Sequence, residues 1–151
     1  MTPMLKAVLD LFTGSNQPDN NRDHSVELAT AALICELINA DNQTDRREKQ
    51  AYRDVLKSQF TLDDDTLNTL VSDGQETADN AVDLVQFTKI INEQCDNEQK
   101  KSILTGLWKV AYADEQLAPI EENVIRRIAD LLYIPHSQFI KTKLSVTGEP
   151  D

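Results

Sequence analysis

Residues 107–132 read LWKVAYADEQLAPIEENVIRRIADLL, and this stretch decides the fold. It begins with an apolar run, continues through an acidic turn at Ala113 and Asp114, and ends with a second apolar run after Pro119. On both sides of the turn, apolar residues recur at the three- and four-residue spacing of amphipathic helices. The stretch therefore predicts a helical hairpin whose two helices are joined by an acidic turn.

The same pattern occurs 73 residues earlier, in residues 34–59, which read ICELINADNQTDRREKQAYRDVLKSQ. Asp41 corresponds to Asp114 and Glu48 to Glu121, with matching apolar positions on either side of these acids. We interpret the chain as carrying a duplicated helical hairpin, with residues 61–94 inserted between the copies. Two such hairpins would bury their apolar faces against each other.

The rest of the chain extends this all-α prediction. Its 151 residues favour one domain, and the scarcity of Gly (4) and Pro (5) suits helices joined by short turns. No run alternates as a strand would. We expect helices over residues 23–40, 45–58, 63–75, 83–94, 96–113, 119–132 and 136–145. The domain organisation is then residues 1–22 as a short amphipathic helix and linker, 23–145 as the helical domain, and 146–151 as a flexible tail.

The N-terminal segment has an apolar stripe formed by Met4, Leu5, Val8, Leu9 and Phe12. This stripe either docks back on the body of the protein or binds a partner. The segment contains no long uninterrupted apolar core, and no stretch of the chain approaches the length of a transmembrane helix. We therefore expect a cytoplasmic location without membrane insertion.

Several polar and sulfur-containing residues have structural interpretations. Capping boxes are expected where an Asp precedes a Gln by three residues, at Asp83 and at Asp96. The two cysteines lie in apolar helical runs without a CxxC pattern, which favours small core residues. Both histidines stand at expected helix starts, as polar caps. These residues are Cys35, Cys95, His24 and His136.

The charge balance is 26 acidic against 15 basic residues, a formal net charge of −11. Phosphate backbones and anionic lipid surfaces would repel such a chain, so nucleic acid is a poor candidate partner. Divalent cations and basic protein surfaces suit it better. The alternative is that the charge only maintains solubility.

The two acidic turns resemble the signature of the TerB family. Residues 40–48 (ADNQTDRRE) and 113–121 (ADEQLAPIE) are similar to its Ala-Asp-Gly turn followed by a Glu that opens a helix. The resemblance implies a compact all-α fold, a link to tellurite resistance or stress response, and divalent-cation binding, but no enzymatic activity. A related domain occurs in the DjlA co-chaperone, although the His-Pro-Asp motif of a J-domain is absent here. The family's Gly is replaced by Asn42 in one turn and by Glu115 in the other.

The acids of the turns have two explanations. Glu48, three residues after Asp45, and Glu121, two after Pro119, suit helix caps stabilised by the helix dipole. Asp41 and Asp114 instead end a helix, where the dipole disfavours an acid. Each Asp must then accept backbone N–H bonds from the following helix, or share a cation with the later Glu.

A divalent cation is the one cofactor that the sequence implies. It would take carboxylate oxygens from one turn or the other, although neither turn fits the 12-residue EF-hand loop. The second turn is the better candidate because no Lys or Arg occurs between Lys109 and Arg126. The candidate ligands are Asp41, Asp45 and Glu48 in the first turn, and Asp114, Glu115 and Glu121 in the second.

The sequence contains no Gly-rich phosphate loop, Gly-x-Ser-x-Gly, His-Glu-x-x-His or Glu-x-x-His motif. It therefore predicts a non-enzymatic TerB-like module that binds a protein partner through an acidic surface. The alternative is a divalent-cation-binding protein that uses its acidic interhelical turns.

Overall fold

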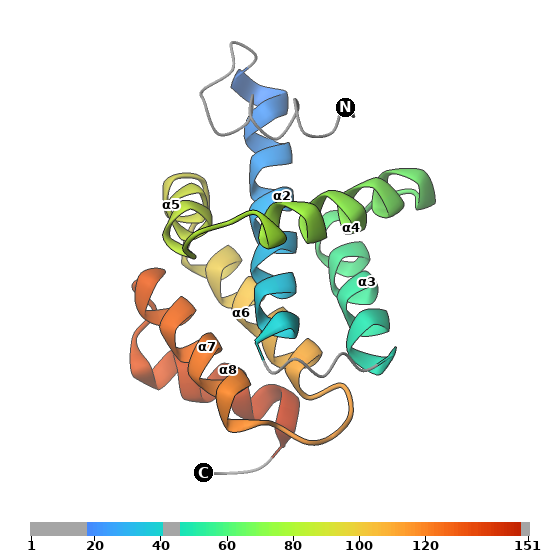
Figure 1. Ribbon diagram of the computed structural model, residues 1–151. Helices are drawn as coiled ribbons and strands as arrows, with labels where there is room; N and C mark the ends of the chain where they lie inside the picture. The colour runs from blue at the N-terminus through green and yellow to red at the C-terminus, as the bar shows by residue number, and fades with distance from the viewer. Residues whose placement is uncertain (1–17, 41–45, 149–151) are drawn as a thin grey trace.

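The computed structural model describes the backbone of residues 18–40 and 46–148, with side chains from Val26 onward (Figure 1). These residues form helices joined by short turns and contain no strand, which confirms the all-α prediction. The helices are α2 (Pro18–Asn39), α3 (Arg46–Phe60), α4 (Asp64–Asp79), α5 (Val85–Gln94), α6 (Asn97–Ala111), α7 (Pro119–Leu131) and α8 (His136–Thr147).

Two helices, α2 and α6, form the centre of the fold. Helix α4 crosses α2, with α5 on one side of α2 and α3 on the other (Figure 1). Helices α3, α7 and α8 all pack against α6. Alanine and cysteine at Ala29, Ala31, Ala32 and Cys35 are fully buried, which lets the surrounding helices approach α2 closely.

The duplicated hairpin is confirmed by which residues are buried. The buried residues of α3 are Glu48, Tyr52, Val55 and Leu56, and those of α7 are Glu121, Ile125, Ile128 and Ala129. Each residue of the first set lies 73 positions before its counterpart in the second. Both copies therefore present the same face of their second helix to the core.

The repeat extends one helix beyond the predicted hairpins. Helices α3 and α7 are each followed by a residue with positive φ, Thr61 (38°) and Tyr133 (60°), 72 positions apart. The N-caps of the next helices, Asp63 and Pro135, have the same separation. Helix α4 then packs on α2, as α8 packs on α6. Each copy is thus a three-helix unit, and α5 is the connecting helix between the units.

Several helix ends differ from the sequence prediction. Helix α2 begins at Pro18 rather than at residue 23, because proline is compatible with a first helical position. Helix α8 continues to Thr147 and ends at Gly148, which has a φ of 71° and is left-handed. The predicted flexible tail is therefore wrong for residues 146–147, because a C-terminal glycine stops a helix only after its last turn.

The capping box at Asp96 is confirmed, whereas the one at Asp83 is wrong. The Asp96 carboxylate accepts the Gln99 N–H at 2.8 Å, and the Gln99 side chain accepts the Asp96 N–H at 2.8 Å. Asp83 instead accepts the N–H groups of Leu84 and Val85, so the chain turns there before α5 begins at Val85.

The second unit is held together around Trp108, which is fully buried. Its ring packs edge-on against Phe139 at a centroid distance of 5.2 Å, and its Nε1–H donates to Thr142 Oγ1 at 3.1 Å. Lys143 Nζ lies 3.1 Å from Glu122 Oε2, which joins α8 to α7. These contacts satisfy the polar atoms that accompany the aromatic core.

Helices α2 and α4 touch most closely at Gly74. A Cβ atom at this position would lie 2.6 Å from Ala31 Cβ and 2.5 Å from Tyr52 Oη. The Tyr52 hydroxyl is fixed because it donates to the Val71 carbonyl at 2.9 Å. The crossing of α4 over α2 therefore depends on the absence of a side chain at this position.

We predict that Gly74→Ala lowers the free energy of unfolding by about 1–2 kcal/mol. Overpacking costs about 1–3 kcal/mol, and the better helix propensity of alanine returns part of it. Urea denaturation would measure the change, with the exposed Ser72→Ala on the same helix as control. A Gly74→Ala protein as stable as the control would contradict this account of the crossing.

Candidate functional site

A backbone N–H of the second acidic turn compensates the unfavourable position of the Asp114 carboxylate at the end of a helix. Asp114 Oδ1 accepts the backbone N–H of Gln116 at 3.0 Å, just after the end of α6. The Glu115 N–H donates to the Tyr112 carbonyl at 2.9 Å, and Glu115 has a φ of 62°. The carboxylate at the helix end is therefore stabilised by a backbone donor of the turn itself, and not of the following helix as the sequence suggested.

Both glutamates of the turns are buried at the start of the following helix. Glu48 and Glu121 are each only 2% exposed. Glu121 Oε1 accepts the N–H of Ala118 at 3.3 Å, and Pro119 is the first residue of α7. The predicted capping role of Glu121 is therefore confirmed. Asp41 and Asp45, the other candidate ligands of the first turn, lie outside the described residues.

In the described part of the chain, no three Asp, Glu, His or Cys side chains gather closely enough to hold a metal ion. Of the second set of candidate ligands, Glu115 is exposed, Asp114 is half-buried and Glu121 is buried. The cation site stays a prediction of the sequence.

The structure assembles an acidic surface that the turns did not predict. It comprises Glu36 on α2 together with Asp73, Glu76, Asp79 and Asp83 on and after α4. Burial and the carboxylates of Asp79 and Asp83 raise the pKa of Glu36. Burial and Glu76 raise the pKa of Asp73. The carboxylates therefore repel one another without full compensation.

One sequence signal could have located this acidic surface. Between Lys57 and Lys89 the chain contains seven acids and no Lys, Arg or His. A charge imbalance on this scale marks α4 as an acidic helix. The contribution of Glu36 had no such signal, because it lies far away in the sequence.

A cleft of about 980 Å³ adjoins the acidic surface, between α4, α3 and the C-terminal end of α2. Glu76 and Asp79 line its α4 side, and Lys49 and Arg53 line its α3 side. Asp79 Oδ1 accepts the side-chain amides of Gln75 at 2.9 Å and Asn39 at 3.3 Å. The cleft therefore has one acidic and one basic wall, and its volume suits a ligand or a peptide segment.

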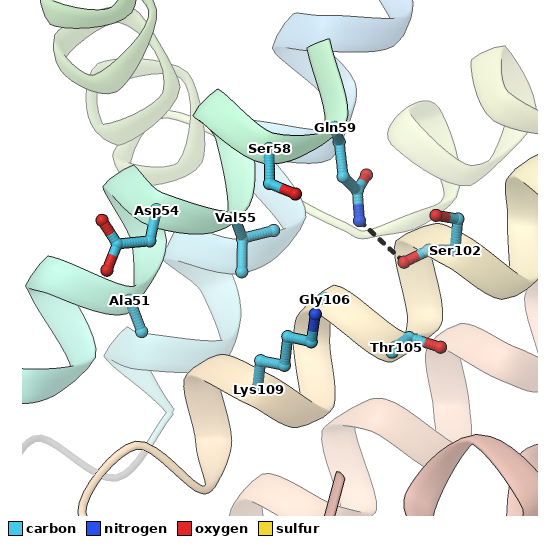
Figure 2. Close-up of a pocket in the computed structure, with 9 residues that line it drawn as sticks. All are labelled: Ala51, Asp54, Val55, Ser58, Gln59, Ser102, Thr105, Gly106 and Lys109. Atoms are coloured by element: carbon cyan, nitrogen blue, oxygen red, sulfur yellow. Dashed lines mark hydrogen bonds between the residues drawn. The ribbon is translucent and has the colours of Figure 1, made fainter. Parts of the chain in front are cut away.

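A second hollow, the α3–α6 groove, lies between those two helices and has a volume of about 350 Å³. Figure 2 shows the Asp54 carboxylate on the α3 side and the Lys109 side chain on the α6 side. Gln59 Nε2 donates to the Ser102 carbonyl at 2.7 Å and bridges the two helices. The groove is lined by Ala51, Asp54, Val55, Ser58, Gln59, Ser102, Thr105, Gly106 and Lys109.

The sequence profile of the family described as tellurite resistance protein TerB matches residues 27–144. The match covers both three-helix units except the first residues of α2 and the last turn of α8. The chain belongs to the TerB family. Comparisons with curated proteins and with solved structures find no match. No helix in the described part of this TerB-family chain is long and apolar enough to cross a membrane.

The backbone of the second turn has a conformation that glycine favours, at the residue after the Ala-Asp pair. In this TerB-family chain that position in the second turn is Glu115, and its φ of 62° lies in the left-handed region. A side chain with a Cβ atom adopts this conformation at a cost of about 1–2 kcal/mol. The turn therefore has the geometry that glycine favours, with a glutamate at that position.

Glu115→Gly is therefore predicted to raise the free energy of unfolding by about 0.5–1 kcal/mol. The relief of backbone strain exceeds the entropy that glycine adds to the unfolded chain. Thermal or urea unfolding would measure the gain, and Glu115→Ala removes the same charge but keeps the Cβ atom. Equal stabilisation by both variants would assign the effect to charge and refute the strain argument.

Proposed function

We propose that this TerB-family chain is a non-enzymatic module that binds a protein partner through its acidic surface, in a tellurite-resistance or stress-response context. The partner would present Lys or Arg residues to Glu36, Asp73, Glu76, Asp79 and Asp83. The context rests on the family, and the surface rests on the charges of this chain.

The observation that supports the proposal is the burial of Glu36 and Asp73 among neighbouring carboxylates, of which Asp83 is paired with Arg127 at 3.5 Å. The raised pKa values of Glu36 and Asp73 mean that each group resists ionisation in the folded protein. Among the described residues, neither Glu76 nor Asp79 forms an ion pair with a Lys or Arg. A basic partner would lower the pKa of each carboxyl on binding, and this relief contributes to affinity.

The chemistry of the cysteines is consistent with a binding role. Burial raises the pKa of the Cys35 thiol to about 12, and burial also raises that of Cys95. Both thiols are therefore protonated at neutral pH and are poor nucleophiles.

A charge reversal on α4 tests the proposed surface. The double variant Glu76→Lys/Asp79→Lys is expected to lose partners that the wild-type chain retains from lysate of the parent cell. Binding of those partners should also weaken between 0.15 M and 1 M salt, where the Debye length falls from about 8 Å to about 3 Å. Quantitative mass spectrometry of the retained proteins provides the measurement.

The matched control is Glu93→Lys/Asp130→Lys, which makes the same change in net charge at exposed acids outside the acidic surface. Thermal melts should show both variants folded. Retention of the same partners by wild type and control, but not by the α4 variant, supports the proposal. Equal loss from both variants would reduce the interaction to non-specific charge attraction, and no loss from either would rule out this surface.

The second candidate function is divalent-cation binding at the second acidic turn. It rests on the presence of Asp114 and Glu115 in the turn that leads to the buried Glu121 of α7. If a cation binds there, millimolar Ca²⁺ should raise the melting temperature by several degrees, because binding to the folded state stabilises it. Asp114→Asn should abolish that increase. A melting temperature unchanged by Ca²⁺, Mg²⁺ and Zn²⁺ would exclude the site.

A further inference from the structure

The duplication of the fold gives the α3–α6 groove a counterpart. Because α3 corresponds to α7 and α6 to α2, the equivalent place in the other half lies between α7 and α2. There the connecting helix α5 packs against both helices. No described helix covers the α3–α6 groove in this way, and the groove remains hollow.

The residues of α7 and α2 that lie near α5 correspond to residues that line the α3–α6 groove. Asn92 Nδ2 of α5 donates to the Leu131 carbonyl of α7 at 2.9 Å. Asp83, just before α5, lies 3.5 Å from Arg127 of α7, and its charge acts on Glu36 of α2. In the repeat of 73 residues, Leu131, Arg127 and Glu36 correspond to Ser58, Asp54 and Lys109, respectively. These three corresponding residues all line the α3–α6 groove.

A segment with the docking pattern of α5 precedes the first unit. Helix α5 packs inward through Leu84, Phe87, Thr88 and Ile91. The N-terminal segment carries Leu5, Val8, Leu9 and Phe12 at the same spacing. Ile91 lies six residues before Asn97, the first residue of α6, and Phe12 lies six residues before Pro18, the first residue of α2.

The charges of the groove suit this segment. Arg127 of α7 lies opposite the acidic Asp83. The residue of α3 that corresponds to Arg127 is Asp54, which carries the opposite charge. The N-terminal segment carries a base, Lys6, two residues after Met4, the position that matches Asp83 when Leu5 is matched to Leu84. Attraction between opposite charges would orient the segment in the groove, as it orients the start of α5.

The linker between the segment and α2 is longer than the offset between the starts of α2 and α6. Helix α2 begins six residues before the position that corresponds to the start of α6, which displaces its beginning by about 9 Å. The five residues from 13 to 17 span up to about 17 Å when extended. This length exceeds the displacement, so the linker permits residues 4–12 to take the place relative to α2 that α5 takes relative to α6.

We propose that residues 4–12 form a helix that docks in the α3–α6 groove, with Leu5, Val8, Leu9 and Phe12 inward and Lys6 beside Asp54. The docked segment is the structural equivalent of α5 and completes the correspondence between the two halves of the fold. It covers Val55 and Gly106 at the base of the groove. The apolar stripe of the N-terminus then docks on its own chain rather than on a partner.

Paramagnetic relaxation in the full chain tests this placement. A nitroxide on Ser58→Cys, with the half-buried Cys95 replaced by Ser, should broaden the amide resonances of residues 4–12 through proximity. The same label on Thr69→Cys, an exposed position of α4, should leave these resonances sharp. No broadening from position 58, or equal broadening from both positions, would overturn the proposal.

A mixed sample separates docking within one chain from docking on a second copy. Isotope-labelled protein without nitroxide is mixed with unlabelled protein carrying the nitroxide at position 58. Sharp resonances of residues 4–12 in this mixture support docking within the chain. Broadening as strong as in the singly labelled sample would show that a second copy occupies the groove, and would overturn the proposal.

A charge swap tests the orientation of the segment. Asp54→Lys should shift the segment toward the undocked state by up to about fivefold, the effect of an exposed ion pair. Adding Lys6→Glu to this variant should restore the broadening. Failure of the second change to restore it would refute the pairing of Lys6 with Asp54.

Discussion

The fold depends on the burial of α2 from nearly every side and of the apolar face of α6 against its neighbours. Between Leu28 and Ile38, only Glu36 of α2 escapes full burial. A helix that is apolar all round must be covered by other helices, because its apolar surface gains free energy only when water is removed from it. Helices α3, α4, α5 and α7 meet this requirement around α2, while α3, α7 and α8 pack on α6.

The helices of the two duplicated units provide most of the contacts that bury α2 and α6. The differences in sequence between the units leave some surfaces uncovered. The equivalent faces of α3 and α7 are buried in the same register, yet their outer faces carry different residues. Arg127 and Leu131 of α7 contact the region of α5, whereas Asp54 and Ser58 of α3 line a groove. The two halves therefore share a core but present different surfaces to solvent and to other segments.

Acidic residues have two roles in this protein, and burial separates them. Glu121 is almost completely buried and caps α7, so its charge is used within the fold. Glu36 and the acids of α4 lie nearer the surface, where their mutual repulsion persists. Charges that the fold leaves uncompensated are available for recognition, and this makes the α4 region a stronger candidate for binding than the acidic turns.

The sequence by itself determined the helices, the duplicated hairpin and the capping role of Glu121, because each depends on spacing within one turn or one repeat. It could not determine that α4 belongs to the repeat, since the third helices match only after a one-residue change in register. Nor could it place Glu36 beside Asp79 and Asp83, or show that Asp114 is satisfied by the Gln116 N–H. Those features follow from how α4 crosses α2 and how the turn closes. Only tertiary packing brings such distant residues together, because the local periodicity of a helix carries no information about which helix will cover it.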